Sequence, residues 1–439
     1  MPSSNSKTDA HADLPPSSAL PPVPADSVLG RVVGGLVVLG LGLGLIVPKV
    51  AGGVFLLLSA IAIVWLEPAL TRRRAIPLTR PGDRLLVAAV GAFVGLWLAA
   101  WALAGFNPAG ADDVGRILRL LLIVPLVLFL RHVRGLDSTI WWGVSLGAIL
   151  AAAHAINLTV NPTANPWSAR VGGATNPIYF GGVVLAFALI LLPRAASPAT
   201  EPVDRLLAAL GLVAGVLAAA LSGSRSAWIA VPLLLPVYAL VLARGQRPLR
   251  RFGWPLALIM TIGLLTLVPG VPLGERVLDA FDSLQDSPGA LDPWDTLAVR
   301  WELWTVAADL VAAHPLLGSG PGAFEAAMAS AAAAGDLHPE LVRYEHPHSQ
   351  YLSALIIGGL PGLAALLALF SVPLLLAARQ LGAEQRSVRQ MAWSTIAAVG
   401  VLAVVALGES IFQRNAGIVW FALLTALTLA RTRAESARD

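Results

Sequence analysis

The sequence predicts an all-α, polytopic membrane protein, and two features of its composition lead to that fold class. Of the 439 residues, 56% are hydrophobic and only 13% are charged, and the mean hydropathy is +0.74. A single soluble core of this length cannot enclose so much apolar surface. The apolar residues are also gathered into runs of about 17–25 residues, and each run can cross a bilayer as a helix that satisfies its own backbone hydrogen bonds.

Twelve such runs divide the chain, at approximately 28–47, 50–68, 84–105, 114–130, 138–157, 178–193, 204–222, 226–243, 253–269, 348–377, 390–408 and 414–430. The tenth run is long enough to tilt or to extend beyond the membrane. We therefore expect the following organisation: a disordered cytoplasmic tail at 1–27, nine transmembrane helices within 28–270, a large, partly helical outer loop at 271–347, three further transmembrane helices within 348–430, and a cytoplasmic tail at 431–439.

The distribution of basic residues predicts the orientation of these helices. Most of the 30 Lys and Arg residues fall in the loops on one side, which the positive-inside rule assigns to the cytoplasm together with both termini. Because the charge is explained in this way, the net charge of +4 does not indicate nucleic acid, and membrane lipids are the expected surroundings. Cysteine is absent, which excludes disulfides, a thiol nucleophile and thiolate metal sites.

A few basic residues fall on the outer side, where the same rule disfavours them, and they include Arg119, Arg170, Arg225 and Arg300. Each could simply extend its head group to the membrane surface. That explanation fits least well for Arg225, in the short turn SGSRSAW, and for Arg300, in AVRWELW. Guanidinium groups bind phosphate oxygens bidentately, so this set of residues favours a phosphate-bearing substrate at the outer surface of the membrane.

Two histidines, His346 and His348, flank a proline directly before the tenth apolar run. His348 could cap the helix end, or it could act as a general base, because imidazole titrates near neutral pH. His346 could be the base instead, or it could orient His348. The sequence alone leaves these alternatives open.

A glycine-rich segment, Gly318–Phe324, reads GSGPGAF and is similar to a phosphate-binding loop. No strand precedes it and no Lys-Ser/Thr follows, so a Gly/Pro turn between two helices is the alternative. The sequence contains no HExxH, no histidine pair with metal spacing, no Asp-x-Asp and no GxSxG motif. We therefore expect neither a metal nor a cofactor.

The segment HSQYLSALIIGGLPG resembles the signature of the O-antigen ligase family, in which a His is followed by Asn, Ser or Gln, nine residues and Gly-x-x-Gly. In this chain the signature reads His348, Ser349, the nine residues 350–358, Gly359 and Gly362. SGSRSAW, RWELWTVA…HPLLGSGPGAFE and ATNPIYFGG are similar, in the same order, to blocks of the wider O-antigen ligase and polymerase superfamily. These motifs cover roughly residues 170–365. Many relatives carry Asn where this chain has Ser349, and this departure weakens a polymerase assignment slightly more than a ligase assignment.

This resemblance implies a C-type membrane glycosyltransferase architecture in the bacterial inner membrane, with the outer loop and the active site facing the periplasm. The implied reaction is metal-independent transfer of O-antigen polysaccharide from undecaprenyl pyrophosphate to the lipid A–core oligosaccharide, which completes lipopolysaccharide. By position, His348 matches the essential histidine of the family, and Arg225 and Arg300 match its essential arginines.

The implied mechanism gives the other candidate residues their roles. Arg225 and Arg300 would bind the donor pyrophosphate, with Arg170 or Arg119 assisting. His348 would take the proton from the acceptor hydroxyl, and attack from the opposite face would invert the anomeric carbon. Further substrate-binding candidates are His346 and three aromatic residues that can stack on sugar rings, namely Trp301, Trp304 and Tyr344.

Three alternatives compete with the ligase hypothesis. An O-antigen polymerase would use the same donor with a growing chain as acceptor. A protein O-oligosaccharyltransferase would need a protein acceptor, which nothing in the sequence indicates. A non-catalytic transporter of lipid-linked sugars would be expected to carry internal repeats and polar residues at the membrane midplane, whereas the polar residues here gather at the outer end.

Overall fold

The computed structural model describes residues 21–71, 81–164, 170–242, 247–265, 267 and 296–432. Within this part of the chain every regular element is helical, and the single β-type contact is an isolated bridge between Val23 and Val133. Residues 1–20 and 433–439 of the predicted tails lie outside the described residues, and so does all of 271–295 in the predicted outer loop.

The helices follow one another as α1 (Val28–Leu43), α2 (Val50–Thr71), α3 (Pro81–Leu103), α4 (Pro108–Ile117), η1 (Leu118–Leu122), α5 (Ile123–Leu130), α6 (Leu136–Val160), η2 (Pro162–Ala164), α7 (Pro177–Ala195), α8 (Pro202–Ser222), α9 (Arg225–Trp228), α10 (Ala230–Val237), η3 (Tyr238–Leu242), α11 (Pro248–Leu265), α13 (Thr296–Ala313), α14 (Ala323–Ala334), η4 (Pro339–Arg343), α15 (Gln350–Ala378), α16 (Arg386–Val405), η5 (Ile411–Gln413) and α17 (Asn415–Arg431).

Eight helical segments in the described residues are long and apolar enough to cross a membrane, which confirms a polytopic, all-helical protein. They are α2, α3, α6, α7, α8, the continuous segment Arg225–Leu242, α15 and α16. The predicted total of twelve is not confirmed. Three of the other four apolar runs form the shorter helices α1, α11 and α17.

The run predicted at 114–130 is divided among α4, η1 and α5. Pro125, close to the start of α5, has no N–H to donate to the carbonyl of Leu121, and its ring crowds that carbonyl. This explains a 3-10 segment at Leu118–Leu122 in place of a continuous α-helix.

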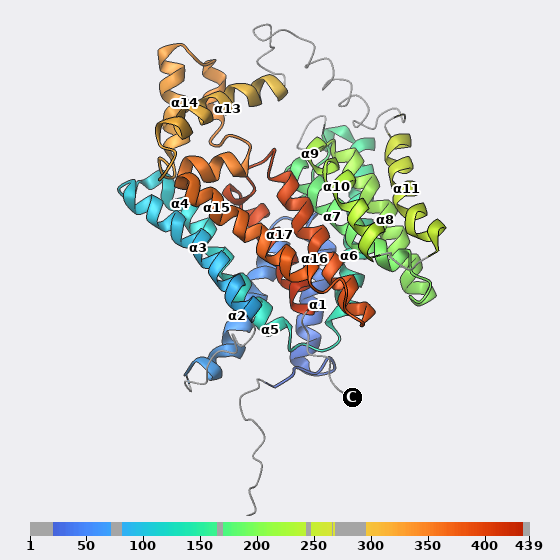
Figure 1. Ribbon diagram of the computed structural model, residues 1–439. Helices are drawn as coiled ribbons and strands as arrows, with labels where there is room; N and C mark the ends of the chain where they lie inside the picture. The colour runs from blue at the N-terminus through green and yellow to red at the C-terminus, as the bar shows by residue number, and fades with distance from the viewer. Residues whose placement is uncertain are drawn as a thin grey trace, which may run out of the picture.

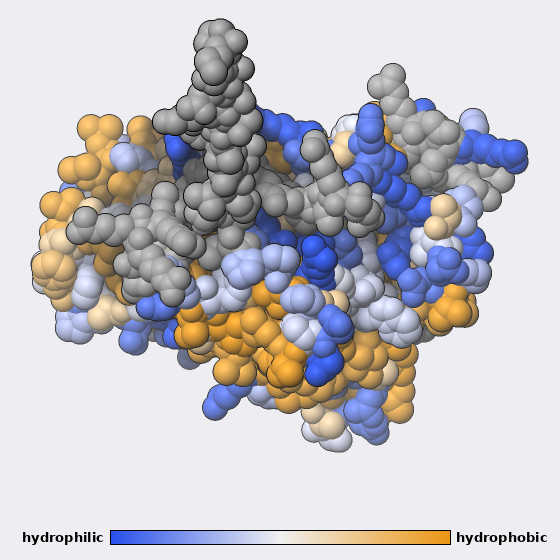
Figure 2. All heavy atoms as spheres, turned by 90° about the horizontal axis from the view of Figure 1, so that it is seen from below, coloured by the Kyte–Doolittle hydropathy of each residue, from blue (hydrophilic) through white to orange (hydrophobic). Residues whose placement is uncertain are grey.

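Both ends of the described chain lie at the same end of the bundle. The Val23 N–H donates to the His132 carbonyl (2.7 Å), and the Val23 carbonyl accepts from the Arg134 N–H (2.9 Å). Near the other terminus, Arg431 donates to the Val133 carbonyl (3.1 Å). Helices α13 and α14 stand at the opposite end (Figure 1). Figure 2 views the molecule from below and shows blue polar side chains bordering exposed orange apolar ones.

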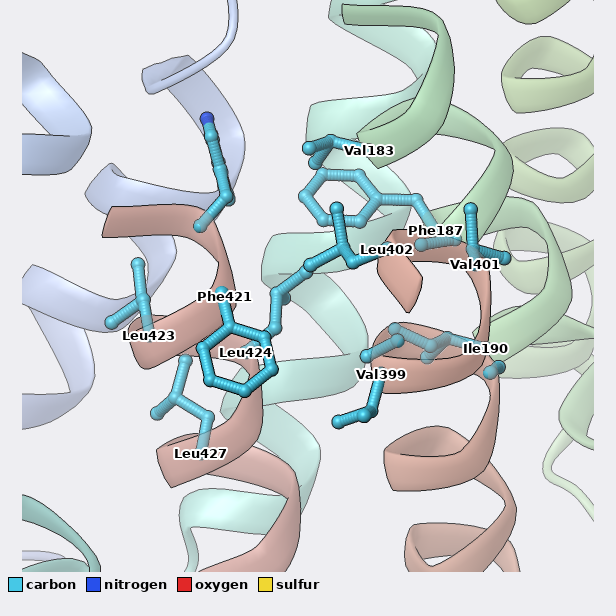
Figure 3. Packing of buried hydrophobic residues seen from close by; sticks show 14 of the residues in the cluster. Val183, Phe187, Ile190, Val399, Val401, Leu402, Phe421, Leu423, Leu424 and Leu427 are labelled. Atoms are coloured by element: carbon cyan, nitrogen blue, oxygen red, sulfur yellow. The ribbon is translucent and has the colours of Figure 1, made fainter. Parts of the chain in front are cut away.

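The core of the bundle is formed by α7, α16 and α17, whose side chains are buried along most of their length. Figure 3 shows Phe187 of α7 and Leu402 of α16 packed toward one another across the helix interface. Small residues bring the neighbouring helix close, because a Cβ on Gly215 of α8 would lie only 2.8 Å from the Val184 carbonyl of α7. Such close packing holds transmembrane helices together where lipid removes the hydrophobic driving force.

The helices α13, α14 and η4 form an outer module, and a bend in α15 positions this module on the bundle. Gly359 has φ +60° and ψ −153°, and Pro361 has no N–H to donate to the Ile357 carbonyl. The freed carbonyls of Ile356 and Ile357 accept instead from the N–H groups of Ser319 (2.6 Å) and Gly320 (3.2 Å).

The same module has a small apolar core of its own, to which α15 contributes. It consists of Val299, Leu303, Ala307, Phe324, Met328, Leu337, Leu341 and Ile356. Because α13 and α15 share this core, residues on α13 are held at a fixed distance from the start of α15, where the histidine pair lies.

Candidate active site

The predicted base His348 lies in a short turn directly before α15. Its φ is +50°, in the left-handed region that residues other than glycine rarely adopt. On one side, the Ser349 hydroxyl caps α15 by accepting from the Leu352 N–H (3.4 Å). On the other side, the indole N–H of Trp304 donates to the Pro347 carbonyl (3.0 Å). Contacts on both sides therefore hold the strained backbone and fix the direction of the imidazole.

A buried carboxylate, Glu409, faces both histidines from the loop after α16. Its Oε2 lies 3.1 Å from Nδ1 of His348, and its Oε1 lies 4.0 Å from Nε2 of His346. Only 1% of the Glu409 side chain is exposed. Burial alone would raise the pKa of Glu409, but the hydrogen bond from His348 and the charges of the histidines and Arg300 outweigh it and hold that pKa below its usual value. An ionised carboxylate only accepts hydrogen bonds, so Nδ1 of His348 is the donor.

Glu409 is a candidate functional residue that the sequence analysis did not find. It lies 61 residues after His348, in the segment GESIF between two apolar runs. One acid in a short loop forms no motif. The available signal was its position, because the predicted topology places this carboxylate at the outer end of a span, on the same face as His348 and the outer arginines.

Arg300 reaches the same loop from α13. Its Nη2 donates to the Gly408 carbonyl (2.9 Å), and a Cβ on Gly408 would lie 2.8 Å from Nη1 of Arg300 and 3.4 Å from Cβ of Ser226. Glycine at this position thus lets the guanidinium and the start of α9 approach together. Since Ser226 follows Arg225, the turn that carries Arg225 lies beside Gly408, and the charge of Arg225 acts on Arg300.

The electrostatic surroundings of Arg300 are mixed. Burial lowers the pKa of Arg300, Glu409 raises it, and Arg225 lowers it again. A guanidinium remains charged at neutral pH despite such shifts. Arg300 thus interacts electrostatically with one carboxylate and one further guanidinium, and these three groups carry an excess of positive charge that suits an anionic substrate.

The other two predicted arginines contact different parts of the site. Nε of Arg170 donates to the Ser222 carbonyl at the end of α8 (3.4 Å), so Arg170 borders the turn that carries Arg225. Arg119, in η1, donates to the side chain of Asn415 at the start of α17. Arg119 therefore lies at the far end of the loop between α16 and α17, away from the buried carboxylate.

The three aromatic residues predicted to stack on sugars lie around the histidine turn or on α13. The ring of Tyr344 meets that of His348 edge to face, with centroids 5.4 Å apart. On α13, Trp301 is 64% exposed and Trp304 is 37% exposed. Apolar ring faces are thus accessible on the outer module, as a carbohydrate-binding surface requires.

The two histidines differ in access and in charge. His346 is buried, and in the described part of the structure its Nδ1 has no hydrogen-bond partner, whereas the side chain of His348 is 22% exposed. Burial and the charge of His348 lower the pKa of His346 to about 4, with Glu409 opposing and Arg414 adding to the shift. His346 is therefore neutral at pH 7. Its accessibility favours His348 as the histidine that meets a substrate.

The comparison with known families concerns the segment that carries most of these residues. Residues 210–367 match the O-antigen ligase family. The matched segment includes Arg225, Arg300 and His348, whereas Glu409 lies beyond it. An uncharacterized protein of Haemophilus influenzae is 20% identical over 339 residues, which cover 75% of this chain and 80% of that protein.

The glycines of the O-antigen ligase signature have structural roles in this chain. A Cβ on Gly359 would lie 2.4 Å from the Leu316 carbonyl, and a Cβ on Gly362 would lie 2.4 Å from the Ala354 carbonyl. The signature therefore joins the histidine turn to a helix that bends against the outer module.

The glycine-rich segment after α13 packs against this bend. Gly318 has φ +72°, and a Cβ there would lie 2.6 Å from the Ile357 carbonyl. The N–H groups of Ser319 and Gly320 donate to α15, so they are not available to bind phosphate. These contacts favour the turn interpretation of this segment over the phosphate-loop interpretation.

The spacing of the histidine cluster is also compatible with a metal. His346, His348 and Glu409 offer ligand atoms that all lie within 4.8 Å of one another. The sequence analysis did not find this cluster, because the carboxylate is distant along the chain. A divalent cation at this position would replace the hydrogen bond from Nδ1 of His348 to the carboxylate, so chelation distinguishes the two arrangements.

Proposed function

We propose that this protein transfers O-antigen polysaccharide from undecaprenyl pyrophosphate to the lipid A–core oligosaccharide. The observation that carries the proposal is the convergence of His348, Glu409 and Arg300 on one loop. It combines an accessible imidazole, a carboxylate that orients it and a buried cation, which together suit the activation of a hydroxyl beside a phosphate leaving group.

In this mechanism His348 is the general base and Glu409 positions it. Because Nδ1 donates to the carboxylate, the lone pair of Nε2 is free to accept the proton of the acceptor sugar hydroxyl. The acceptor oxygen then forms a bond to the anomeric carbon as the bond from that carbon to the pyrophosphate oxygen breaks. The proton ends on Nε2, and the carboxylate of Glu409 stabilises the resulting imidazolium.

Arg225 and Arg300 stabilise the leaving group. The electron pair of the broken bond passes to undecaprenyl pyrophosphate, and two nearby guanidinium groups offset the negative charge that develops there. Arg170, beside the Arg225 turn, can contact the same diphosphate. Attack from the face opposite the leaving group inverts the anomeric carbon.

We further propose that the protein is in the bacterial inner membrane, with both termini in the cytoplasm and the active site at the periplasmic surface. Two observations support this orientation. The candidate site lies at the end of the bundle opposite the described termini, and the loops at the end that holds the termini are the ones rich in arginine.

The proposal can be tested in a bacterial strain that lacks this gene, by analysing the lipopolysaccharide that the strain makes when a wild-type or variant gene is supplied. The wild-type gene should restore long O-antigen chains, and His348→Ala should not, although the variant inserts into the membrane at normal levels. In the variant strain, intact polymer should accumulate on the lipid carrier. Normal laddering with His348→Ala would exclude the proposed base, and single repeats on the carrier would indicate a polymerase instead.

A further inference from the structure

An open groove lies between α1 and α6, at the end of the molecule where the described termini meet. Its volume is about 810 Å³, within the range of about 300–1,000 Å³ that is common for ligand sites. The candidate active site lies at the opposite end of the bundle, so this groove has no part in the transfer proposed above.

The walls of the groove are apolar, and glycine residues leave a hollow in them. Leu39, Trp142 and Leu146 line it and are exposed. A Cβ on Gly35 would meet nothing within 4 Å, and one on Gly34 would meet only the side chain of Thr139, at 3.7 Å. Since α6 is long and apolar enough to cross a membrane and α1 is a shorter apolar helix, a hydrocarbon chain is the natural occupant of the hollow.

Two arginines, Arg31 and Arg134, line one end of this apolar groove, and both are exposed. Nη1 of Arg31 donates to the Asp26 carbonyl (2.5 Å), and the backbone N–H of Arg134 donates to the Val23 carbonyl (2.9 Å). The segment from Val23 to Asp26 therefore holds both arginines at the same end.

Neighbouring carboxylates do not neutralise this pair. Asp137 lies close by in the sequence but pairs with Arg431 (2.5 Å), and Asp83 pairs with Arg131 (2.6 Å). Within the described ranges, no carboxylate forms an ion pair with Arg31. The same holds for Arg134, so neither guanidinium is held in an ion pair.

We propose that this groove binds a diacyl phospholipid with an anionic head group. The phosphate lies between Arg31 and Arg134, and one acyl chain lies along Gly34 and Gly35. An anionic lipid satisfies both halves of the groove at once, because guanidinium groups bind phosphate oxygens and the apolar walls bind the chain.

Native mass spectrometry of the purified full-length protein in detergent tests this site. The protein is titrated separately with phosphatidylglycerol and with phosphatidylcholine. Wild type should bind phosphatidylglycerol more tightly. The double variant Arg31→Gln/Arg134→Gln should bind it about thirtyfold more weakly, since each arginine near the lipid surface contributes about fivefold. Equal affinity for the two lipids in wild type would overturn the proposal.

A substitution that fills the hollow tests binding of the acyl chain separately from binding of the head group. Gly35→Leu should weaken phosphatidylglycerol binding at least tenfold. Two controls should bind as wild type does: Gly53→Leu on α2, where a Cβ also meets nothing within 4 Å, and Arg379→Gln, an exposed arginine at the end of α15. Undiminished binding by Gly35→Leu, or an equal loss in either control, would contradict a site in this groove.

Discussion

Replacing Glu409 by Gln tests the pairing of His348 with its buried carboxylate. The substitution keeps the size of the side chain, and the amide oxygen can still accept from Nδ1 of the neutral imidazole. It removes the negative charge that stabilises the imidazolium formed when His348 takes a proton. A hydrogen bond to a charged group contributes about 1.5–3 kcal/mol. At about 1.36 kcal/mol per factor of ten, the rate of transfer should fall roughly 10- to 150-fold.

The assay is transfer of polysaccharide between its lipid carrier and lipid A–core by purified protein, with kcat and KM measured separately. The loss should appear in kcat, because the charge acts only as the proton moves. Glu345→Gln is the matched control. Its ion pair with Arg414 (3.4 Å) is exposed and contributes little, so its kcat should stay within about twofold of wild type. Wild-type kcat in Glu409→Gln, or a change confined to KM, would refute this role for the carboxylate.

Four further predictions concern the site and the bend in α15. Arg300→Lys should lower transfer about tenfold, because an ammonium cannot bind both the Gly408 carbonyl and a phosphate; full activity would contradict this. The pKa of His346 is about 4 in the folded protein and about 6.5 in an unfolded chain, so the unfolded state binds a proton first as the pH falls. The free energy of unfolding should therefore drop by about 3 kcal/mol between pH 6.5 and 4, and thermal unfolding in detergent should show that His346→Leu loses this dependence. Gly359→Ala should lower the unfolding free energy by about 1–3 kcal/mol because of the positive φ at this position. The control Gly358→Ala, where a new Cβ meets nothing within 4 Å, should unfold at the wild-type temperature or above. Equal unfolding midpoints for the two variants would argue against strain at the bend. Chelation with EDTA should leave the transfer rate unchanged, and a loss restored by a divalent cation would favour a metal at the histidines.

The all-helical class and eight helices long enough to cross a membrane could be predicted, because unbroken apolar runs of sufficient length leave the chain few choices in lipid. The predicted span at 114–130 is not confirmed as a single long helix, because local backbone chemistry interrupts this run. Pro125 accompanies a division of the run at 114–130 into three short helices, and hydropathy alone does not register it. Likewise, the bend at Gly359 depends on carbonyl groups that a separate loop satisfies, and a sequence pattern does not show which loop that is.

The candidate site was only partly accessible from sequence for a similar reason. His348 and Arg300 lie within motifs that can be recognised as contiguous strings. Glu409 takes its significance from a contact with His348 across 61 residues, and Gly408 takes its significance from the approach of Arg300. Three-dimensional packing creates both relationships, so the only sequence signal for Glu409 was its position at the outer end of a predicted span, and Gly408 had none.

The most direct test of the account is the reconstitution of transfer with purified components. Wild-type protein, polysaccharide on undecaprenyl pyrophosphate and lipid A–core oligosaccharide are combined in detergent, and product is followed by gel mobility. We expect wild type to extend lipid A–core with polysaccharide and folded His348→Ala to form no such product. Absence of product with active donor and acceptor, or equal product from the two proteins, would contradict it.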